Sequence, residues 1–290
     1  MKILKNNLFG IYEKALPPGD LEEKIIYASN AKFDFLEMSI DESDKRLMRL
    51  NMDDKYIEKI LSICKNNNIF IRSICFSAQR RYPLGSHNEN IRKQSIEMLK
   101  QCILLAFKLN IRIIQIAGYD VFYEEKDDNT KKWFIEGLNE GLWFANIYGV
   151  NLSIEIMDDP FINSITKYLE LKKRCQSPWL SVYPDLGNLS AWNKKNTIIE
   201  LEKGFGEIVA LHIKDTLEVK DDFKGKFKNV NFGEGCVDFK KIFKYLKDKK
   251  YSGSFLIEAW YEDFPDPTNN LDKSKKFITD IFRETGWELC

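Results

Sequence analysis

Histidine is scarce in this chain, and its positive and negative charges cancel. The 290 residues contain only His87 and His212, which excludes any metal site built from three or more histidines. The 44 basic and 44 acidic side chains give a formal net charge of zero. Nucleic-acid-binding proteins normally carry an excess of basic residues that displaces counterions from the phosphates. The composition therefore predicts that nucleic acid is not a partner.

Cysteine motifs and long apolar runs are also missing. The six cysteines form no C-x-x-C pair and no zinc-binding spacing with histidine, so we expect reduced thiols rather than a disulfide framework. No run approaches the roughly 18 apolar residues that a membrane span requires. The first residues lack the apolar core of a secretory signal. These absences predict a cytoplasmic protein without a membrane partner.

What the chain does contain is a regular alternation of short apolar runs with longer amphipathic stretches. Eight runs alternating with eight helical patterns predict a parallel sheet with crossover helices. The predicted strands are Leu8–Lys14, Phe33–Ile40, Ile71–Ala78, Ile111–Gly118, Asn151–Met157, Leu180–Pro184, Ile208–Lys214 and Ser254–Trp260. The predicted helices are Asp20–Asn30, Asp53–Asn66, Asn90–Leu109, Asn129–Ile147, Ser164–Cys175, Asn196–Lys203, Asp238–Lys249 and Pro267–Glu284.

Several predicted strands are apolar at consecutive positions, as in Ile111–Ala117 and Ile208–Ile213. Such strands are typical of parallel sheets covered on both faces, whether closed or open. The count of eight favours a closed barrel, and no dinucleotide loop supports the open alternative, because Gly204–Gly206 lacks the third glycine and precedes a strand. We therefore predict an α/β fold, a (β/α)8 TIM barrel with a single domain over residues 1–290. Thr216–Val237 is a long irregular stretch, and such stretches are usually functional or disordered.

Polar residues stand at the ends of the last four predicted strands, where active sites of (β/α)8 barrels lie. They are Glu155, Asp185, His212 and Glu258. Each alone has a purely structural explanation, such as a carboxylate paired with lysine or a core histidine. Three carboxylates directed into one barrel mouth would repel one another unless a cation neutralised them. Because three carboxylates and an imidazole suit hard or borderline cations, we predict one divalent metal ion, with Mn²⁺ or Zn²⁺ preferred and Mg²⁺ or Co²⁺ as alternatives.

Six segments of the chain resemble the L-ribulose-5-phosphate (L-xylulose-5-phosphate) 3-epimerases, some of which carry the label hexulose-6-phosphate isomerase. The segments are Gly10–Pro17, Leu36–Ser39, Arg80–Ser86, Ala117–Asp120, Pro184–Trp192 and Phe227–Gly235. This family belongs to the xylose-isomerase-like barrels, and the resemblance covers nearly the whole chain. It implies a (β/α)8 barrel whose Glu155, Asp185, His212 and Glu258 hold one divalent metal ion. It also implies a small phosphorylated ketose as substrate, bacterial L-ascorbate or pentose catabolism and a homodimer.

The reaction implied by the resemblance interconverts L-xylulose 5-phosphate and L-ribulose 5-phosphate through a cis-enediolate. A base removes the C3 proton and an acid returns a proton on the opposite face, while a metal ion polarises the ketone. Glu155 and Glu258 are the predicted catalytic pair, because the fifth and eighth strands of a barrel face each other across its mouth. The nearest alternative is an aldose–ketose isomerase acting on a related sugar or on hexulose 6-phosphate.

Two further alternatives belong to other functional classes. An abasic-site endonuclease of the same barrel superfamily needs a histidine-rich three-zinc cluster, which two histidines do not supply. A non-catalytic sugar-binding barrel is disfavoured because the Glu/Asp/His/Glu set is complete.

Substrate-binding residues are predicted less directly. Lys214 lies two residues past His212 and so shares its strand face, which makes it our first candidate for the phosphate group, with Arg80 and Arg81 as alternatives. Asn188 and Asp158 are expected to contact sugar hydroxyls.

Close relatives have histidine where this chain has Gln79, which can hydrogen-bond a hydroxyl but cannot exchange a proton near neutral pH. Ser77, two residues earlier, completes the predicted substrate-binding set. The loop after the seventh strand offers lysines and the amides of Gly233 and Gly235 to an anion, although lysine-rich loops are usually just solvated. His87 lies in a polar loop, where we expect it to be exposed.

Overall fold

Eight parallel strands and ten α-helices alternate along the part of the chain that the computed structural model describes, residues 3–263 and 266–290. The strands are β1 (Phe9–Tyr12), β2 (Phe35–Ile40), β3 (Phe70–Phe76), β4 (Ile113–Ala117), β5 (Asn151–Glu155), β6 (Leu180–Tyr183), β7 (Ala210–Ile213) and β8 (Ser254–Ile257). The helices are α1 (Leu21–Asn30), α2 (Asp44–Leu47), α3 (Asp54–Asn66), α4 (Glu89–Lys108), α5 (Asp128–Tyr148), α6 (Ile165–Cys175), α7 (Leu186–Asn193), α8 (Thr197–Lys203), α9 (Phe239–Asp248) and α10 (Pro267–Glu284). All eight predicted strands are confirmed to within a few residues at each end, and β3 begins one residue before its predicted start.

The sheet has the strand order β6-β5-β4-β3-β2-β1-β8-β7, in which consecutive strands are neighbours except for β6 and β7, which stand at the two ends of the order, and β1 is next to β8. Strands β4 and β7 are buried along their whole length, as the consecutive apolar positions predict for strands covered on both faces. The chain divides into two compact units, residues 37–62 with 71–183 and residues 1–36 with 63–70 and 184–290. The single domain predicted for residues 1–290 stays a prediction, and residues 1–2 and 264–265 lie outside the described residues.

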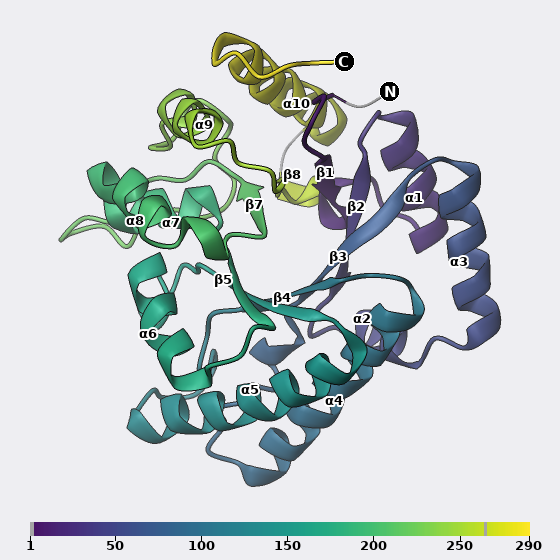
Figure 1. The fold of residues 1–290 in the computed structure, drawn as a ribbon, viewed down its shortest axis with the longest axis vertical. Coiled ribbons are helices and arrows are strands. Elements are labelled where there is room, and N and C mark those ends of the chain that lie inside the picture. The colour runs from purple at the N-terminus through teal and green to yellow at the C-terminus, as the bar shows by residue number, and fades with distance from the viewer. Residues whose placement is uncertain (1–2, 264–265) are drawn as a thin grey trace. The chain divides into compact units, whose positions relative to one another are not determined.

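The unit of residues 37–62 and 71–183 contains β3 to β6 in consecutive parallel pairs. Ala117 at the end of β4 pairs with Glu155 at the end of β5, which fixes the carboxyl ends of these strands side by side. Helices α4 and α5 lie alongside one another (Figure 1). A capping box between Asp127 and Thr130 starts α5, and Gly149, with φ of +63°, ends it.

The unit of residues 1–36, 63–70 and 184–290 contains β1, β8 and β7, paired in parallel in that order. Its core is aromatic: the rings of Phe243, Phe255 and Phe282 are fully buried, with centroids 4.5–5.5 Å apart. Phe243 comes from α9 and Phe282 from α10, so both helices pack on Phe255 of β8 through these rings. None of the described helices is long and apolar enough to cross a membrane.

Candidate metal centre

Asp185 is held at the start of a helix that the sequence pattern did not reveal. Its Oδ1 accepts a hydrogen bond of 2.6 Å from the backbone N–H of Asn188, which makes Asp185 the N-cap of α7. Helix α7 escaped prediction because it is buried on nearly all sides and contains poor helix formers. Gly187 is required here, since a Cβ at this position would lie 2.8 Å from the carbonyl oxygen of Lys214. The close approach brings the Asp185 carboxylate to the end of β7.

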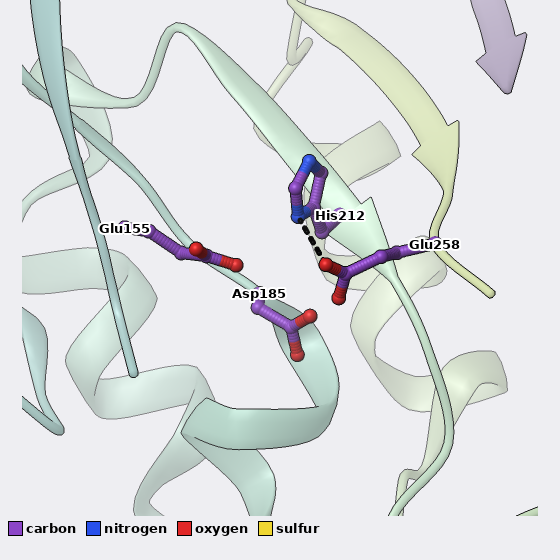
Figure 2. A group of neighbouring side chains, drawn as sticks. All are labelled: Glu155, Asp185, His212 and Glu258. Carbon is purple, nitrogen blue, oxygen red and sulfur yellow. Dashed lines mark ion pairs between the residues drawn. The ribbon is translucent and has the colours of Figure 1, made fainter. Parts of the chain in front are cut away.

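His212, in β7, is completely buried and pairs with the chain that follows β6. Its backbone N–H donates to the Pro184 carbonyl at 3.0 Å, and the backbones of Asp185 and His212 form a parallel β-bridge. Glu258 directly follows β8, and its Oε1 lies 3.8 Å from Nδ1 of His212 (Figure 2). The three residues therefore converge through backbone pairing rather than through flexible side chains alone.

Lys214 is buried among these carboxylates. Its Nζ lies 2.8 Å from Oε2 of Glu258 and 3.0 Å from Oδ2 of Asp185, and only 7% of the residue is exposed. Burial by itself raises the pKa of Glu258, but neighbouring Lys214 and His212 outweigh it and hold this pKa below its usual range. Sequence reasoning placed Lys214 on the correct strand face and did not foresee its ion pairs with Asp185 and Glu258.

Glu155 ends β5, where it is 4% exposed and accepts a hydrogen bond from the side-chain amide of Gln115 in β4. Sequence reasoning missed Gln115, although a glutamine in the apolar run Ile113–Ala117 is a visible signal. Glu155, Asp185, His212 and Glu258 each offer one ligand atom, and these four atoms all lie within 4.8 Å of one another (Figure 2).

These residues fit a divalent ion by their chemistry. Three buried carboxylates and one imidazole form a donor set of the hard or borderline type. The four predicted residues are thus a candidate ligand group, and its role as a metal centre is a proposal developed below.

Gln79 lies in a short 3-10 helix, Ala78–Arg80, just after β3, and is 3% exposed. Neither its amide nitrogen nor its amide oxygen has a hydrogen-bond partner among the described residues. A buried amide without partners is costly and marks a position where a ligand can satisfy it. Ser77 is also nearly buried, and its backbone N–H donates to Ile40.

Arg80 and Asp158 are linked through an aromatic residue that sequence reasoning did not single out. The Arg80 guanidinium lies 5.0 Å from the ring centroid of Phe122 and 5.7 Å from that of Tyr119. The Tyr119 hydroxyl donates to Asp158 Oδ1. Burial, and next the Asp158 carboxylate, raise the pKa of Tyr119, so the phenol stays protonated as the donor. These contacts fix the loops that follow β3, β4 and β5 relative to each other.

The loop after β7 is organised by Asp215, which is 1% exposed. Asp215 Oδ2 accepts the N–H groups of Gly233 at 2.9 Å and Gly235 at 3.0 Å. The idea that these two amides bind a substrate anion is therefore wrong, because a side chain of the protein already occupies them. The ammonium group of Lys228, in the same loop, lies 4.4 Å from the ring centroid of Trp260.

His87 is half-exposed, as expected for a loop residue, but it has defined partners. Its Nδ1 lies 3.2 Å from Glu124 Oε2, and its Nε2 lies 3.3 Å from Asp127 Oδ2. Hydrogen bonds that the imidazole donates to Asp127 and then to Glu124 raise the pKa of His87 above its usual value. His87 thus ties the loop after β3 to the start of α5.

Known proteins similar to this chain agree with the fold. Residues 25–281 match the family described as xylose isomerase-like TIM barrel, which confirms the predicted fold class. The putative L-ribulose-5-phosphate 3-epimerase SgbU of Haemophilus influenzae is 43% identical over 288 residues, 99% of this chain and 100% of that protein. The L-ribulose-5-phosphate 3-epimerase UlaE of Escherichia coli O157:H7 is 43% identical over 278 residues, 96% of this chain and 95% of its own length.

Solved structures show the same fold at low sequence identity. A structure of L-ribulose 3-epimerase has a TM-score of 0.75 and 15% identity, with 96% of this chain and 95% of that chain covered. A structure of D-psicose 3-epimerase from Clostridium cellulolyticum has a TM-score of 0.75 and 16% identity, with 96% of this chain and 98% of that chain covered.

Proposed function

This chain belongs to the xylose isomerase-like TIM barrel family, and we propose that it is a metal-dependent sugar-phosphate 3-epimerase. The proposed reaction interconverts L-xylulose 5-phosphate and L-ribulose 5-phosphate. The observation that carries the proposal is the buried group of Glu155, Asp185, His212 and Glu258, in a chain 43% identical over nearly its full length to L-ribulose-5-phosphate 3-epimerases. The enzyme is an isomerase in the broad sense, because no atoms are gained or lost.

Glu155, Asp185, His212 and Glu258 would hold one divalent metal ion, with Mn²⁺ or Zn²⁺ preferred over Mg²⁺ or Co²⁺. A bound ion would polarise the substrate ketone as a Lewis acid and so acidify the C3 proton. The charge that develops on the cis-enediolate is costly in a buried site unless groups there are arranged to stabilise it.

We assign the two proton transfers to Glu155 and Glu258. Each carboxylate is oriented by a separate donor, Glu155 by the Gln115 amide and Glu258 by the Lys214 ammonium. One carboxylate removes the C3 proton as a general base, and the other, in its protonated form, returns a proton to the opposite face. For the reverse reaction the two glutamates exchange these roles.

We propose that six residues bind the substrate: Lys214, Asn188, Asp158, Gln79, Ser77 and Arg80. Gln79 has the best structural support, because its buried amide is without a partner and can bind a sugar hydroxyl as both donor and acceptor. Asn188 is 1% exposed and lies in the first turn of α7, which Asp185 caps. A phosphate-binding role for Lys214 predicts that Lys214→Ala raises KM for the phosphorylated ketose. Asp158 already accepts from Tyr119, so it has one carboxylate oxygen engaged.

We further propose that the enzyme acts in the cytoplasm, in L-ascorbate or pentose catabolism, and as a homodimer. The support for these statements is the similarity to UlaE and SgbU, together with a net charge of zero, which offers no basic excess for nucleic acid.

The experiment that tests the proposed function is an NMR assay with L-xylulose 5-phosphate in D₂O, with and without a chelator. We expect deuterium at C3 and accumulation of L-ribulose 5-phosphate, both abolished by the chelator and restored by Mn²⁺. Deuterium at C1 or C2 would instead identify an aldose–ketose isomerase, for which hexulose 6-phosphate is the next substrate to test. Absence of exchange at every carbon with metal present would refute both reactions.

A further inference from the structure

The metal centre of the proposed function contains an ammonium group that belongs to the protein. Lys214 Nζ lies 2.8 Å from Glu258 and 3.0 Å from Asp185, two of the four candidate ligands. It donates a hydrogen bond to Glu258, is almost fully buried, and lies 5.4 Å from the ring centroid of Trp260. A buried lysine loses side-chain entropy and hydration, so its position between two carboxylates calls for an electrostatic explanation.

Charge balance supplies that explanation. The candidate ligands include three carboxylates, and the imidazole of His212 binds a metal in its neutral form. A divalent ion neutralises two of the three negative charges, and the Lys214 ammonium neutralises the third. Without a metal ion, the ammonium is a positive charge in direct contact with two of the carboxylates.

We propose that Lys214 is a built-in counter-ion of the metal centre, which holds Asp185 and Glu258 in place when no metal is bound and lowers the affinity of the site for divalent cations. The inference rests on the proposed function only for the existence of the metal centre. It assigns Lys214 a positioning role toward the ligands. That role can be tested apart from any contact with the substrate phosphate, because metal affinity and KM are measured independently.

The sign of the effect follows from electrostatics. Lys214 attracts the carboxylates in both states, but in the metal-bound state it is also repelled by the nearby divalent ion. It therefore stabilises the metal-free protein more than the metal-bound protein. By linkage, removal of its charge makes metal binding tighter and makes the metal-free protein less stable.

The test compares Lys214→Met and Lys214→Gln with the wild-type full chain and with a control, Lys126→Met. Lys126 also bridges two carboxylates, Asp120 at 3.1 Å and Asp159 at 2.6 Å, but neither belongs to the candidate ligand group. Mn²⁺ affinity is measured by titration calorimetry on chelator-treated protein, and melting temperature is measured with and without Mn²⁺.

We expect both Lys214 variants to bind Mn²⁺ at least ~10-fold more tightly than wild type, because a like charge next to the ion is removed. We also expect a lower melting temperature without metal and a larger rise on adding Mn²⁺. Lys126→Met should bind Mn²⁺ with wild-type affinity. A Lys214 variant that folds only when Mn²⁺ is supplied would agree with the proposal, since it is the extreme form of the same shift.

Equal or weaker Mn²⁺ binding in both Lys214 variants, with wild-type binding intact, would overturn the counter-ion role and leave the proposed function standing. The same tightening in Lys126→Met would also overturn it, because the effect would then be one of overall charge. If the wild-type chain binds no divalent cation, the metal centre of the proposed function fails as well, and the two failures are thereby distinguished.

Discussion

Replacement of Asp215 by asparagine tests how far a single carboxylate organises the loop after β7. Its Oδ1 accepts the N–H groups of Thr216 at 2.9 Å and Val237 at 3.3 Å, and its Oδ2 accepts those of Gly233 and Gly235. Asparagine keeps one oxygen and replaces the other with an NH₂ group. Two backbone donors then face another donor, in a position where the side chain is buried and water does not replace the lost acceptor.

The magnitude follows from the two lost acceptors. A buried donor left without a partner costs about 1–3 kcal/mol, so Asp215→Asn should lower the free energy of unfolding by about 2–6 kcal/mol. Each kcal/mol corresponds to about 2–4 °C of melting temperature in large domains, and a loss of about 3 kcal/mol predicts a decrease of about 6–12 °C. If the loop opens locally instead, its amides should lose protection while the rest of the chain keeps it.

The assay combines calorimetry with hydrogen exchange of the 216–237 segment. The matched control is Asp222→Asn, which makes the same chemical change at an exposed position in the same loop and should leave both readouts unchanged. An Asp215→Asn protein that melts within about 1 °C of wild type, with the amides of Gly233 and Gly235 still protected, would refute the assigned role of this carboxylate.

Three further predictions concern catalysis, packing and pH. Glu155→Gln and Glu258→Gln should each lower kcat by at least ~100-fold in the epimerase assay, and near-normal turnover in either would contradict the two-glutamate scheme. Gly235→Ala should lower the free energy of unfolding, measured in urea, by about 2 kcal/mol or more, because its Cβ would lie 2.0 Å from a carboxylate oxygen of Asp215. The control Gly206→Ala, whose Cβ would have nothing within 4 Å, should change the same free energy by no more than about 0.5 kcal/mol. The pKa of His87 measured by NMR should lie above the usual value for histidine. Its stabilising contribution is therefore complete below that usual value and is lost as the pH rises through the raised pKa, and a pKa at or below the usual value would exclude the two ion pairs.

Much of the fold could be predicted because each strand is a short apolar run bounded by an amphipathic helix. The errors have specific causes. Helix α7 was missed because its residues Leu186–Asn193 are buried around most of the helix and show no amphipathic pattern. The glycine amides at positions 233 and 235 were interpreted as an anion site because their acceptor, Asp215, lies 18 and 20 residues away in the sequence.

By itself, the sequence determined the alternation of strands and helices and the identity of the four candidate metal ligands. The alternation shows as periodicity, and each ligand shows as a polar residue at the end of an apolar run. Only the tertiary structure decided the partners of those ligands: Lys214 meets Glu258 across 44 residues, and Gln115 meets Glu155 across 40. Such pairs depend on how neighbouring strands are aligned, and strand register is set by packing between segments that no local pattern connects. The carboxylates were therefore visible in the sequence, and their pairing with Lys214 and Gln115 was not.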